Sequence, residues 1–559
     1  MKKTNLLYIT AIAAAGLFAS CKKNYLDLVP TDRVSDASIL ADSSLFEDYV
    51  INRYLGIKII DKEGEGTLPG FGRAFEYSMW SSNSDESIYN NDDGSWLIQR
   101  GQIAPENLGN AGAFWGRSYR GIRDCNYGLG NIATVTMSKQ HKDYLTGELK
   151  FLRAYRYQDL IRNYGGVVLI GDKVYNLKDN LQDVALYQRS SIKDCIAYAV
   201  AQLDNAAQLL PQDNSGSWPL GRATKGAALA LKARLLLYAA SPLYNTGTWT
   251  DAAAAAKAVM SLNKYSLQSD YSSLFIDQGM ASSEIIFGRQ YTVTAPHVRM
   301  EISNGPNGYG GWAGNTPLQN LVDGYQMNNG KDITDGASGY DTQNPYVNRD
   351  PRFYATILYN GASYRGSTID AYSPGGKDSK DSPSNWNTTK TGYYLRKFMN
   401  DKNVIDNPWS STGQQPWIYL RYAEILLNYA EAQNEAVGPD ASVYSAVNQI
   451  RQRLSVGMPP LPAGLSQAQM RDAIRKERRV ELAFEEHRFY DVRRWKIADV
   501  VENLPAGGMT MVKNTNGTFT YTLKTALDGK AFYTKNYWLP IPRSEILASG
   551  NQLKQNDGY

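Results

Sequence analysis

The sequence predicts a mainly helical protein in which repeated helical hairpins carry long irregular loops and short strands. Alanine-rich amphipathic stretches occur in pairs separated by short breaks, which is the pattern of a helical-repeat scaffold. Two stretches with little helical periodicity, about 61–113 and 289–410, are rich in Gly, Asn, Asp, Ser and aromatic residues. A chain of 559 residues can form a large core, and long loops on such a scaffold are usually functional.

The first segment reads as an export signal. Lys2 and Lys3 precede the apolar run 6–18, and Ala19-Ser20 then lead into a lone Cys21. Small residues before a cysteine resemble the bacterial lipoprotein cleavage box, which predicts a signal peptide over 1–20 and a lipidated Cys21; an ordinary secretory signal is the alternative. The apolar run is too short to span a bilayer, so we expect membrane attachment by the lipid anchor only.

Four pairs of amphipathic segments follow along the chain. Gly165-Gly166, Pro211 and Gly438-Pro439 interrupt them, as helix-breaking residues should. The pairs resemble tetratricopeptide-type repeats that build an α-α superhelix; an unrelated helical bundle is the alternative. The predicted helical segments are approximately 40–55 with the looser partner 114–132, 142–164 with 191–210, the two halves of 224–260, and the two halves of 419–454.

A charged segment near the C-terminus, 471–495, is predicted to be one helix. Arg478 and Glu481 stand three residues apart, as do Glu485 and Arg488, so ion pairs along a single helix explain the charges. A catalytic pairing of these carboxylates with His487 is the alternative. We favour the salt-bridged helix because helical spacing alone accounts for the pattern.

The densest group of aromatic and amide residues lies within 304–317, where Tyr309 and Trp312 stand among glycines. A pyranose ring presents an apolar C–H face that stacks on an aromatic ring, and its hydroxyls suit amide and carboxylate partners. Glycines permit close approach of the backbone to a ligand. The segment therefore predicts a sugar-binding platform.

A second candidate loop covers 84–96. It offers Trp96 as the ring, with Asp85 and Asn90 as hydrogen-bonding groups. Any one of these aromatic rings could instead fill a gap between loop and scaffold. Because two such loops occur in one chain, we predict glycan binding by Asp85, Asn90, Trp96, Tyr309 and Trp312.

Composition excludes several classes of function. The 59 basic and 55 acidic residues leave a net charge of +4, too small over this length for nucleic-acid binding. Three histidines and three cysteines argue against a His-dependent triad, a multi-histidine zinc site or a disulfide framework. Asp92-Asp93 and 332–335 lack the spacing of an EF-hand calcium loop and are better explained as solvated turns. No metal site or cofactor is predicted; a structural calcium ion, which no motif supports, is the alternative.

Several longer motifs resemble those of the SusD/RagB outer-membrane nutrient-binding lipoproteins of Bacteroidetes. The resemblance covers nearly the whole chain; its one departure is Asp557, where relatives often have proline. The matching segments are Tyr25-Leu-Asp-Leu-Val-Pro30 after Cys21, Gly147–Tyr157 with Tyr164-Gly-Gly166, Arg222–Ala227, Arg349-Asp-Pro-Arg-Phe353, Leu420–Ala432, Arg475–Asp491, Leu539-Pro-Ile-Pro542 and Gln555–Tyr559.

This resemblance implies a fold of four tetratricopeptide-like hairpins, with loops on one side that form a glycan-binding surface. It also implies a cell-surface location and a partner, a SusC-like TonB-dependent outer-membrane barrel to which bound oligosaccharide is delivered. Such proteins bind and do not cleave. The ring-bearing loops of relatives correspond by residue type to those of Trp96, Tyr309 and Trp312.

Two other functions stay open at this point. A surface glycoside hydrolase would need a carboxylate pair in the aromatic cleft, and a repeat scaffold could bind peptide or protein instead of glycan. Removal of Lys2 and Lys3 leaves 57 basic and 55 acidic residues, so a neutral polysaccharide is the expected ligand.

Overall fold

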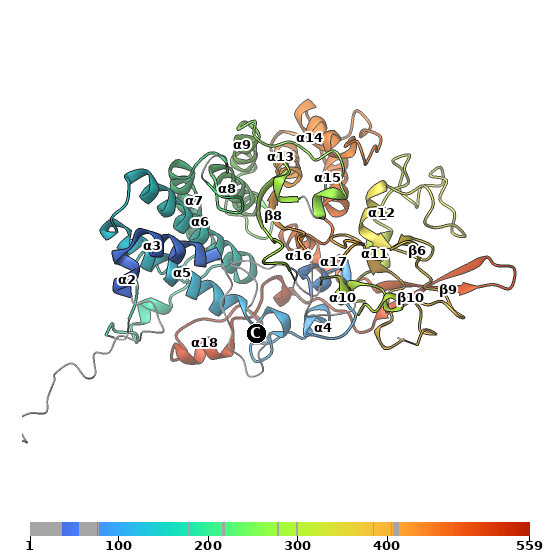
Figure 1. The fold of residues 1–559 in the computed structure, drawn as a ribbon, viewed down its shortest axis with the longest axis horizontal. Coiled ribbons are helices and arrows are strands. Elements are labelled where there is room, and N and C mark those ends of the chain that lie inside the picture. The colour runs from blue at the N-terminus through green and yellow to red at the C-terminus, as the bar shows by residue number, and fades with distance from the viewer. Residues whose placement is uncertain are drawn as a thin grey trace, which may run out of the picture.

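Antiparallel α-helices stack side by side in one half of the protein, and irregular loops with short strands form the other half (Figure 1). This computed structural model describes residues 36–54, 75, 78–176, 178–214, 218–276, 279–297, 300–383, 385–403, 405 and 413–559. The expected fold class, mainly helical with short strands, is confirmed. The predicted signal peptide and Cys21 lie outside the described residues.

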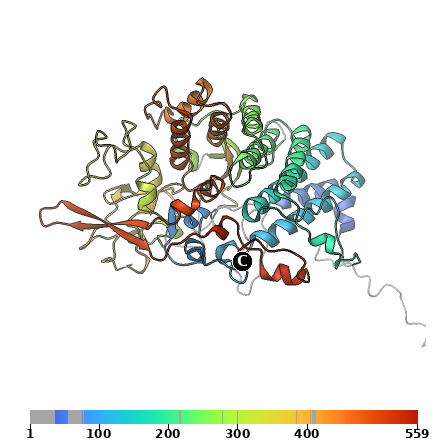
Figure 2. The same ribbon diagram turned by 180° about the vertical axis from the view of Figure 1, so that it is seen from behind.

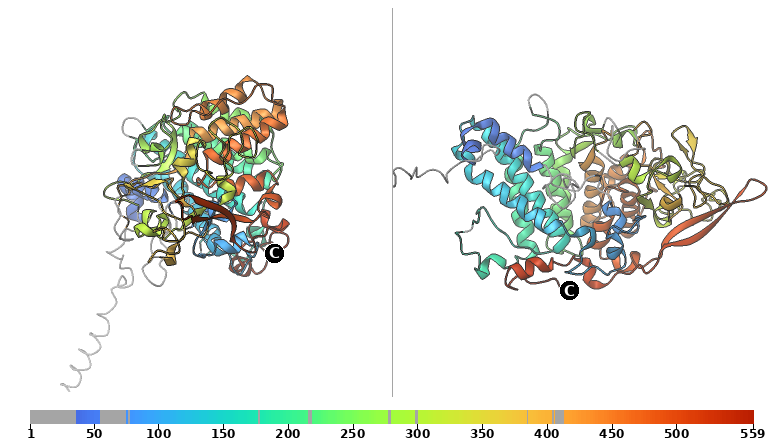
Figure 3. Two further views of the ribbon diagram at one scale, coloured as in Figure 1. Left: turned by 90° about the vertical axis from the view of Figure 1, so that its right-hand side faces the viewer. Right: turned by 60° about the horizontal axis from the view of Figure 1, so that its bottom comes forward.

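The helical half is a continuous stack in which each helix packs on the next (Figure 3). Its order is α5, α6, α7, α8, α9, α13 and α14, so the chain leaves the stack after α9 and returns at α13. The bounds are α2 Asp36–Ala41, α3 Ser43–Ile51, α5 Phe114–Asn131, α6 Lys139–Tyr164, α7 Ile192–Leu209, α8 Lys225–Ala240, α9 Trp249–Met260, α13 Tyr422–Val437 and α14 Ala441–Arg451.

Glycines on α5 let that helix approach α6 closely. A Cβ atom on Gly121 would lie 2.5 Å from Nε of Arg156, and one on Gly128 would lie 2.8 Å from Cδ1 of Leu149. Both distances are shorter than ordinary van der Waals contact, so a larger residue would require the Arg156 or Leu149 side chain to move. Gly121 and Gly128 are thus packing residues.

The segment predicted as one helix over 471–495 is two helices, and that prediction is wrong. α15 covers Gln467–Glu481 and α16 covers Arg488–Arg494, with a tight turn between them. Phe484 and Glu486 in this turn have φ angles of 62° and 65°, a left-handed conformation that ends a helix. The charged side chains therefore point to other segments rather than along one helix.

Those charges form a buried ionic core, defined here by three arginines and four glutamates. Nη1 of Arg421 lies 2.8 Å from carboxylate oxygens of both Glu284 and Glu481. Despite burial, which raises it, the pKa of Glu481 is held below its usual range by the surrounding arginines. The full set is Arg352, Arg421 and Arg453 with Glu284, Glu477, Glu481 and Glu485.

The loop-rich half contains short helices and two-stranded sheets. The five strand pairs of the described residues are antiparallel: β1 Ser87–Tyr89 with β3 Asn315–Pro317, β2 Ile285–Arg289 with β8 Trp417–Arg421, β4 Ile357–Leu358 with β7 Tyr394–Leu395, β5 Ser363–Tyr364 with β6 Ser367–Thr368, and β9 Ala506–Lys513 with β10 Phe519–Leu527. The short helices are α4 Ser95–Gln99, α10 Met300–Asn304, α11 Gln319–Val322, α12 Pro351–Thr356 and α17 Ala498–Val501; a further short helix, α18 Arg543–Ala548, lies beneath the helical half (Figure 1).

The β9–β10 hairpin projects from the body of the protein at its loop-rich end (Figure 2). Met509 and Met511 on β9 are buried against the body, whereas the outer part of β10 is exposed. The buried methionines thus anchor β9 to the body of the protein, while the outer part of β10 faces solvent.

Candidate functional site

The two candidate loops meet in one short sheet. β1 pairs with β3 so that Ser87 faces Pro317 and Tyr89 faces Asn315. The pairing continues one residue further, where the Asn90 N–H donates to the Gly314 carbonyl at 2.7 Å. Segments separated by more than 200 residues therefore share one face, which neither segment reveals by itself.

Buried amides fix the shape of the 304–317 loop. Oδ1 of Asn304 accepts hydrogen bonds from the backbone N–H of Asn315 at 3.0 Å and from its Nδ2 at 2.8 Å. Oδ1 of Asn315 in turn accepts from the N–H of Met79 and the hydroxyl of Ser82. Because these groups satisfy one another inside the fold, they hold the loop rather than face a ligand.

The glycines of this loop serve backbone packing. A Cβ on Gly311 would lie 2.1 Å from the carbonyl oxygen of Gly305, and one on Gly314 would lie 2.5 Å from that of Ser303. The chain folds back on itself too closely for any side chain at these positions. We expected these glycines to let the backbone approach a ligand. In the structure they let two parts of the same loop approach each other.

Asp85 is buried and paired. Its carboxylate accepts from Nε of Arg488 at 2.7 Å and from Nη2 of Arg479 at 2.7 Å, and its exposed fraction is 2%. Although burial raises it, the pKa of Asp85 is held below its usual range by the two arginines. In this conformation Asp85 ties its loop to α15 and α16, and its oxygens are not presented to solvent.

In Glu86, the next residue, the pKa of the carboxyl is shifted in the opposite direction. Burial raises the pKa of its carboxyl to about 7. Oε2 of Glu86 accepts a long hydrogen bond, 3.4 Å, from the N–H of Phe484. A carboxyl pair with separated pKa values is a feature of acid–base catalysis, but both side chains are buried here.

Asn90 positions another loop. Its Nδ2 donates to the Thr388 carbonyl at 3.0 Å, and its Oδ1 accepts from the Lys390 N–H at 2.9 Å. The Asn90 side chain is 2% exposed, and both the nitrogen and the oxygen of its amide bind backbone groups. The residue connects β1 to the segment 385–390.

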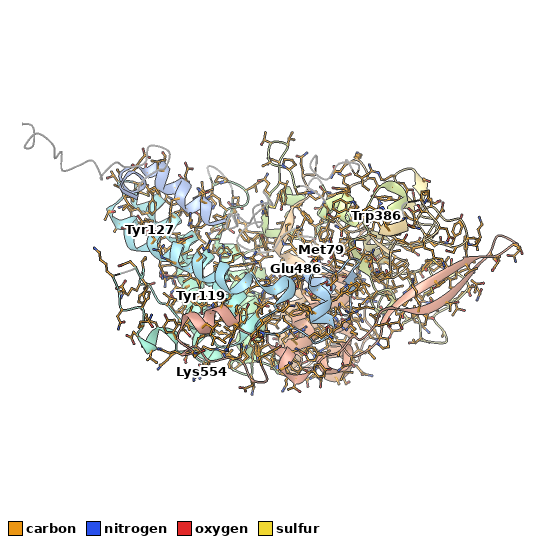
Figure 4. All side chains as sticks on the ribbon, turned by 90° about the horizontal axis from the view of Figure 1, so that it is seen from below. Met79, Tyr119, Tyr127, Trp386, Glu486 and Lys554 are labelled. Carbon is orange, nitrogen blue, oxygen red and sulfur yellow. The ribbon has the colours of Figure 1, made fainter. Side chains whose placement is uncertain are left out.

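That segment carries Trp386, which sequence analysis missed. The side chain is 71% exposed, and it lies in the loop-rich half of the protein (Figure 4). An indole exposed to this degree is unusual and marks a surface on which something can stack. The signal in the sequence was a tryptophan between two asparagines, Asn385 and Asn387, within a loop already expected to be functional.

Trp96 is half-buried on α4. Its indole N–H donates to the Tyr89 carbonyl at 2.8 Å, and its ring packs on a small cluster that includes Ile88 and Leu318. The guanidinium carbon of Arg100 lies 5.1 Å and Nζ of Lys390 lies 5.7 Å from the ring centroid. The part of the ring that reaches the surface is therefore bordered by positive charge.

Tyr309 and Trp312 are also half-buried. The Tyr309 ring packs edge-on against Tyr364, with centroids 5.0 Å apart, and its hydroxyl donates to the Tyr364 and Thr368 carbonyls at 3.2 Å. Trp312 is fixed through its backbone N–H, which donates to the Ile302 carbonyl at 2.7 Å. Tyr309 is thus committed partly to the fold, whereas Trp312 keeps its indole N–H free of any hydrogen-bond partner among the described residues.

Asp378 secures the tip of the same loop. Its two carboxylate oxygens accept from the N–H groups of Gly308 at 3.1 Å and Asp370 at 2.9 Å. Burial raises the pKa of this carboxyl to about 6. The tip of the 304–317 loop, next to Tyr309, is therefore held by a side chain from outside the loop.

The acidic turns do not form a metal centre. Oδ1 of Asp92 accepts from the Gly94 N–H at 2.9 Å, and Asp332 forms an ion pair with Lys476. Among the described residues, no group of three or more His, Cys, Asp or Glu side chains is arranged to hold a metal ion.

A hollow of about 490 Å³ beside α15 bears on the peptide-binding alternative. Its lining includes Lys476 and Glu477, which already pair with Asp332 and with Arg352 and Arg451. Lys476 and Glu477 are thus already engaged in ion pairs, unlike the exposed indole of Trp386.

Comparison with known proteins agrees with the architecture. The SusD family matches residues 279–559, which include the loop region after β2, the ionic core and the projecting hairpin. The chain belongs to the SusD family. A second family, described as "Starch-binding associating with outer membrane", matches residues 58–237.

Relatives cover most of the SusD-family chain. A solved SusD-like protein from Bacteroides fragilis is 32% identical, with 95% of this chain and 100% of that chain covered and a TM-score of 0.77. A SusD-like carbohydrate-binding protein from the same species is 25% identical over 92% of this chain and 100% of that chain, also with a TM-score of 0.77. SusD-like protein P2 of Formosa agariphila is 25% identical over 81% of each chain.

Within the described part of this SusD-family chain, every helix is too short or too polar to cross a bilayer.

Proposed function

We propose that the protein is a cell-surface glycan-binding lipoprotein that captures oligo- or polysaccharide and delivers it to a SusC-like TonB-dependent outer-membrane transporter. Membership of the SusD family supports this role, as does the description of the second matching family. Attachment through Cys21 would place the binding domain at the outer membrane. The protein binds its ligand and does not cleave it.

The observation that carries the proposal is the face on which the two candidate loops converge. β1 and β3 join these loops, and Asn90 holds the segment of the exposed Trp386 beside them. Tryptophan rings at a surface suit the amphipathic faces of sugars. Trp96, Tyr309, Trp312 and Trp386 are the proposed contact residues, whereas Asp85 and Asn90 are positioning residues.

The energetics of such a face suit a protein that passes its ligand on. If each ring contributes on the order of 1 kcal/mol beyond area burial, with a few hydrogen bonds at about 1 kcal/mol each, micromolar to millimolar dissociation constants result. Weak sites can still retain a polymer, because binding at several positions raises the effective concentration. Release to a transporter remains fast.

Affinity electrophoresis tests the proposal. The chain from residue 22 is run through gels that contain a panel of polysaccharides, beside Trp312→Ala, Trp386→Ala and the control Trp249→Ala. Trp249 is half-buried at the start of α9 and belongs to the helical half. We expect one or more polymers to retard the wild type and the control, and dissociation constants roughly 3- to 10-fold weaker in the two loop variants.

Equal retardation of all four proteins would show that these rings do not contact glycan. The glycosidase alternative is checked in the same samples by assaying reducing ends after prolonged incubation with the retarding polymer. We expect their concentration to stay at the level of the protein-free control, and a steady increase would contradict a purely binding role.

A further inference from the structure

Lys380, Lys390 and Lys524 gather at the surface beside Trp96. All three side chains are exposed, and they come from two separate parts of the chain, the 380–390 segment and β10. Burial lowers the pKa of Lys524, and the positive charges of Lys390 and Lys380 lower it further. The Lys524 ammonium group therefore lies close enough to Lys390 and Lys380 to be repelled by both. The Thr388 hydroxyl donates to the Ser379 carbonyl at 3.1 Å, which holds the chain next to Lys380 against the chain next to Lys390.

Backbone contacts explain how this gathering arises. The N–H of Met509 donates to the Thr391 carbonyl at 2.7 Å, which docks β9 on the residue after Lys390. The strand register then places Lys524 opposite Gly508. A Cβ on Gly508 would lie 2.9 Å from the Thr391 carbonyl oxygen, so only glycine permits this contact. The arrangement is built into the base of the hairpin.

Trp96 and Arg100 complete the group. The indole of Trp96 packs in the same small cluster as Ala526 and Leu527 of β10. Arg100 and Lys390 both lie within 6 Å of that ring, at 5.1 and 5.7 Å from its centroid. The Trp96 basic patch is defined here as Trp96, Arg100, Lys380, Lys390 and Lys524.

The lysines of this patch are not neutralised within the described structure. None of the three forms an ion pair with a carboxylate of the described residues, and Nε of Arg100 donates to a backbone carbonyl, that of Asp528. Among the carboxylates near these residues in sequence, Asp92 and Asp93 accept N–H groups of their own turn, and Asp381 accepts the Gly375 N–H at 3.1 Å. Charge is thus concentrated here although the mature chain is nearly neutral.

We propose that the Trp96 basic patch binds anionic sugar residues, bearing uronate carboxylates or sulfate esters, within the polysaccharide ligand. This inference rests on the proposed glycan-binding function. It names an anionic polysaccharide as the ligand, whereas the net charge of the chain led us to expect a neutral one. An anionic group relieves the repulsion between the lysines, and its sugar ring reaches the exposed part of Trp96.

The test compares two triple variants with the same change of charge. Lys380→Gln, Lys390→Gln and Lys524→Gln remove the patch; Lys178→Gln, Lys193→Gln and Lys554→Gln remove three exposed lysines of the helical half. Lys554 lies at the opposite side of the protein from Trp386 in Figure 4. Each protein, as the chain from residue 22 without the lipidated Cys21, is run in gels with alginate, polygalacturonate, carrageenan or fucoidan. Matched gels contain methyl-esterified polygalacturonate, desulfated carrageenan or dextran.

We expect at least one anionic polymer to retard the wild type and the control triple equally, with binding about tenfold weaker in the patch triple. Esterification or desulfation of that polymer should abolish retardation and shows which anion is recognised. Added NaCl at 0.5 M should weaken binding because it screens charges beyond a few ångströms. Matching thermal melting curves confirm that both triples are folded.

Retardation by a neutral polymer, unchanged in the patch triple, would overturn this inference and leave the glycan-binding function standing. Absence of retardation by every polymer would overturn both. Co-sedimentation with phosphatidylglycerol vesicles, lost in the patch triple while no polysaccharide is bound, would assign the patch to a lipid surface instead.

Discussion

Neighbouring carboxyls, Asp85 and Glu86, show how local contacts decide the state of a side chain. Asp85 meets two guanidinium groups and stays ionised, whereas Glu86 is buried and meets a hydroxyl and a weak N–H donor. Burial disfavours the charged form unless an opposite charge compensates. The pKa of Asp85 is therefore lowered and that of Glu86 is raised, so their contributions to folding stability change with pH in opposite directions.

We expect Glu86→Gln to stabilise the protein at pH 8 but not at pH 4. The folded pKa of Glu86, about 7, lies above its ordinary value, so wild-type stability falls as pH rises from about 4.5 to 7 and then stays level. The gain at pH 8 is at most about 3 kcal/mol. Calorimetric melting at pH 4, 6 and 8 measures it.

Asp85→Asn is the contrasting variant. It leaves Arg479 and Arg488 without a carboxylate, which should cost about 3–5 kcal/mol at pH 8. A gain for Glu86→Gln of the same size at pH 4 as at pH 8 would refute the assigned protonation of Glu86.

The sequence showed which residue types occur in the candidate loops, but it did not show which of their side chains are buried. Tryptophans among glycine and asparagine predicted a ring-bearing surface, and Trp96 and Trp312 do reach solvent in part. Asp85 looked equally suited to a sugar hydroxyl. Its partner Arg479 lies 394 residues away along the chain, so no local pattern shows that the carboxylate is already engaged.

At the scale of elements, the glycines of α5 separate into two groups. Gly121 and Gly128 lie against α6, whereas Gly116 and Gly130 have no atom within 4 Å of an added Cβ. Glycine in an exposed helical position is costly, because it loses more backbone entropy on folding than alanine. The same substitution should thus act in opposite directions along one helix.

We expect Gly116→Ala to raise the free energy of unfolding by about 0.5–1 kcal/mol. Gly128→Ala should lower it by about 1–3 kcal/mol, since its Cβ meets Leu149. Urea denaturation followed by circular dichroism gives both values. Stabilisation by both variants would mean that α5 and α6 are packed less closely than the structure shows.

Helical periodicity predicted the stacked helices to within a few residues, because each buries one face against a neighbour. The sequence pattern failed where long-range contacts override it. Glu481 at the end of α15 and Glu485 in the following turn both pair with Arg421 rather than with Arg478 and Arg488, their partners in the predicted helix. The β9–β10 hairpin was not assigned at all, although Asn516-Gly517 between alternating apolar residues is a turn signal.

For the whole molecule, attachment to the membrane is the property most open to a direct test. Cys21 lies outside the described residues, and the described helices cannot span a bilayer. We expect Cys21→Ser to move the protein from the membrane fraction to the soluble fraction, because acyl chains supply the attachment. Fractionation followed by immunoblotting measures the shift. A variant that stays with the membrane in high salt would reveal another anchor.

The ionic core has a consequence for how the protein opens. Its charges come from β8, α12, α15 and the turn after α15, together with Glu284 just before β2 and Arg453 just after α14. Each arginine finds its partners only when these segments are together. If one element detached while the rest stayed packed, a buried charge would lose its partner, at a cost of several kcal/mol. Partial unfolding is therefore suppressed at the centre of the protein. Proteases cut chains that have opened locally, so this centre should outlast the projecting hairpin under digestion.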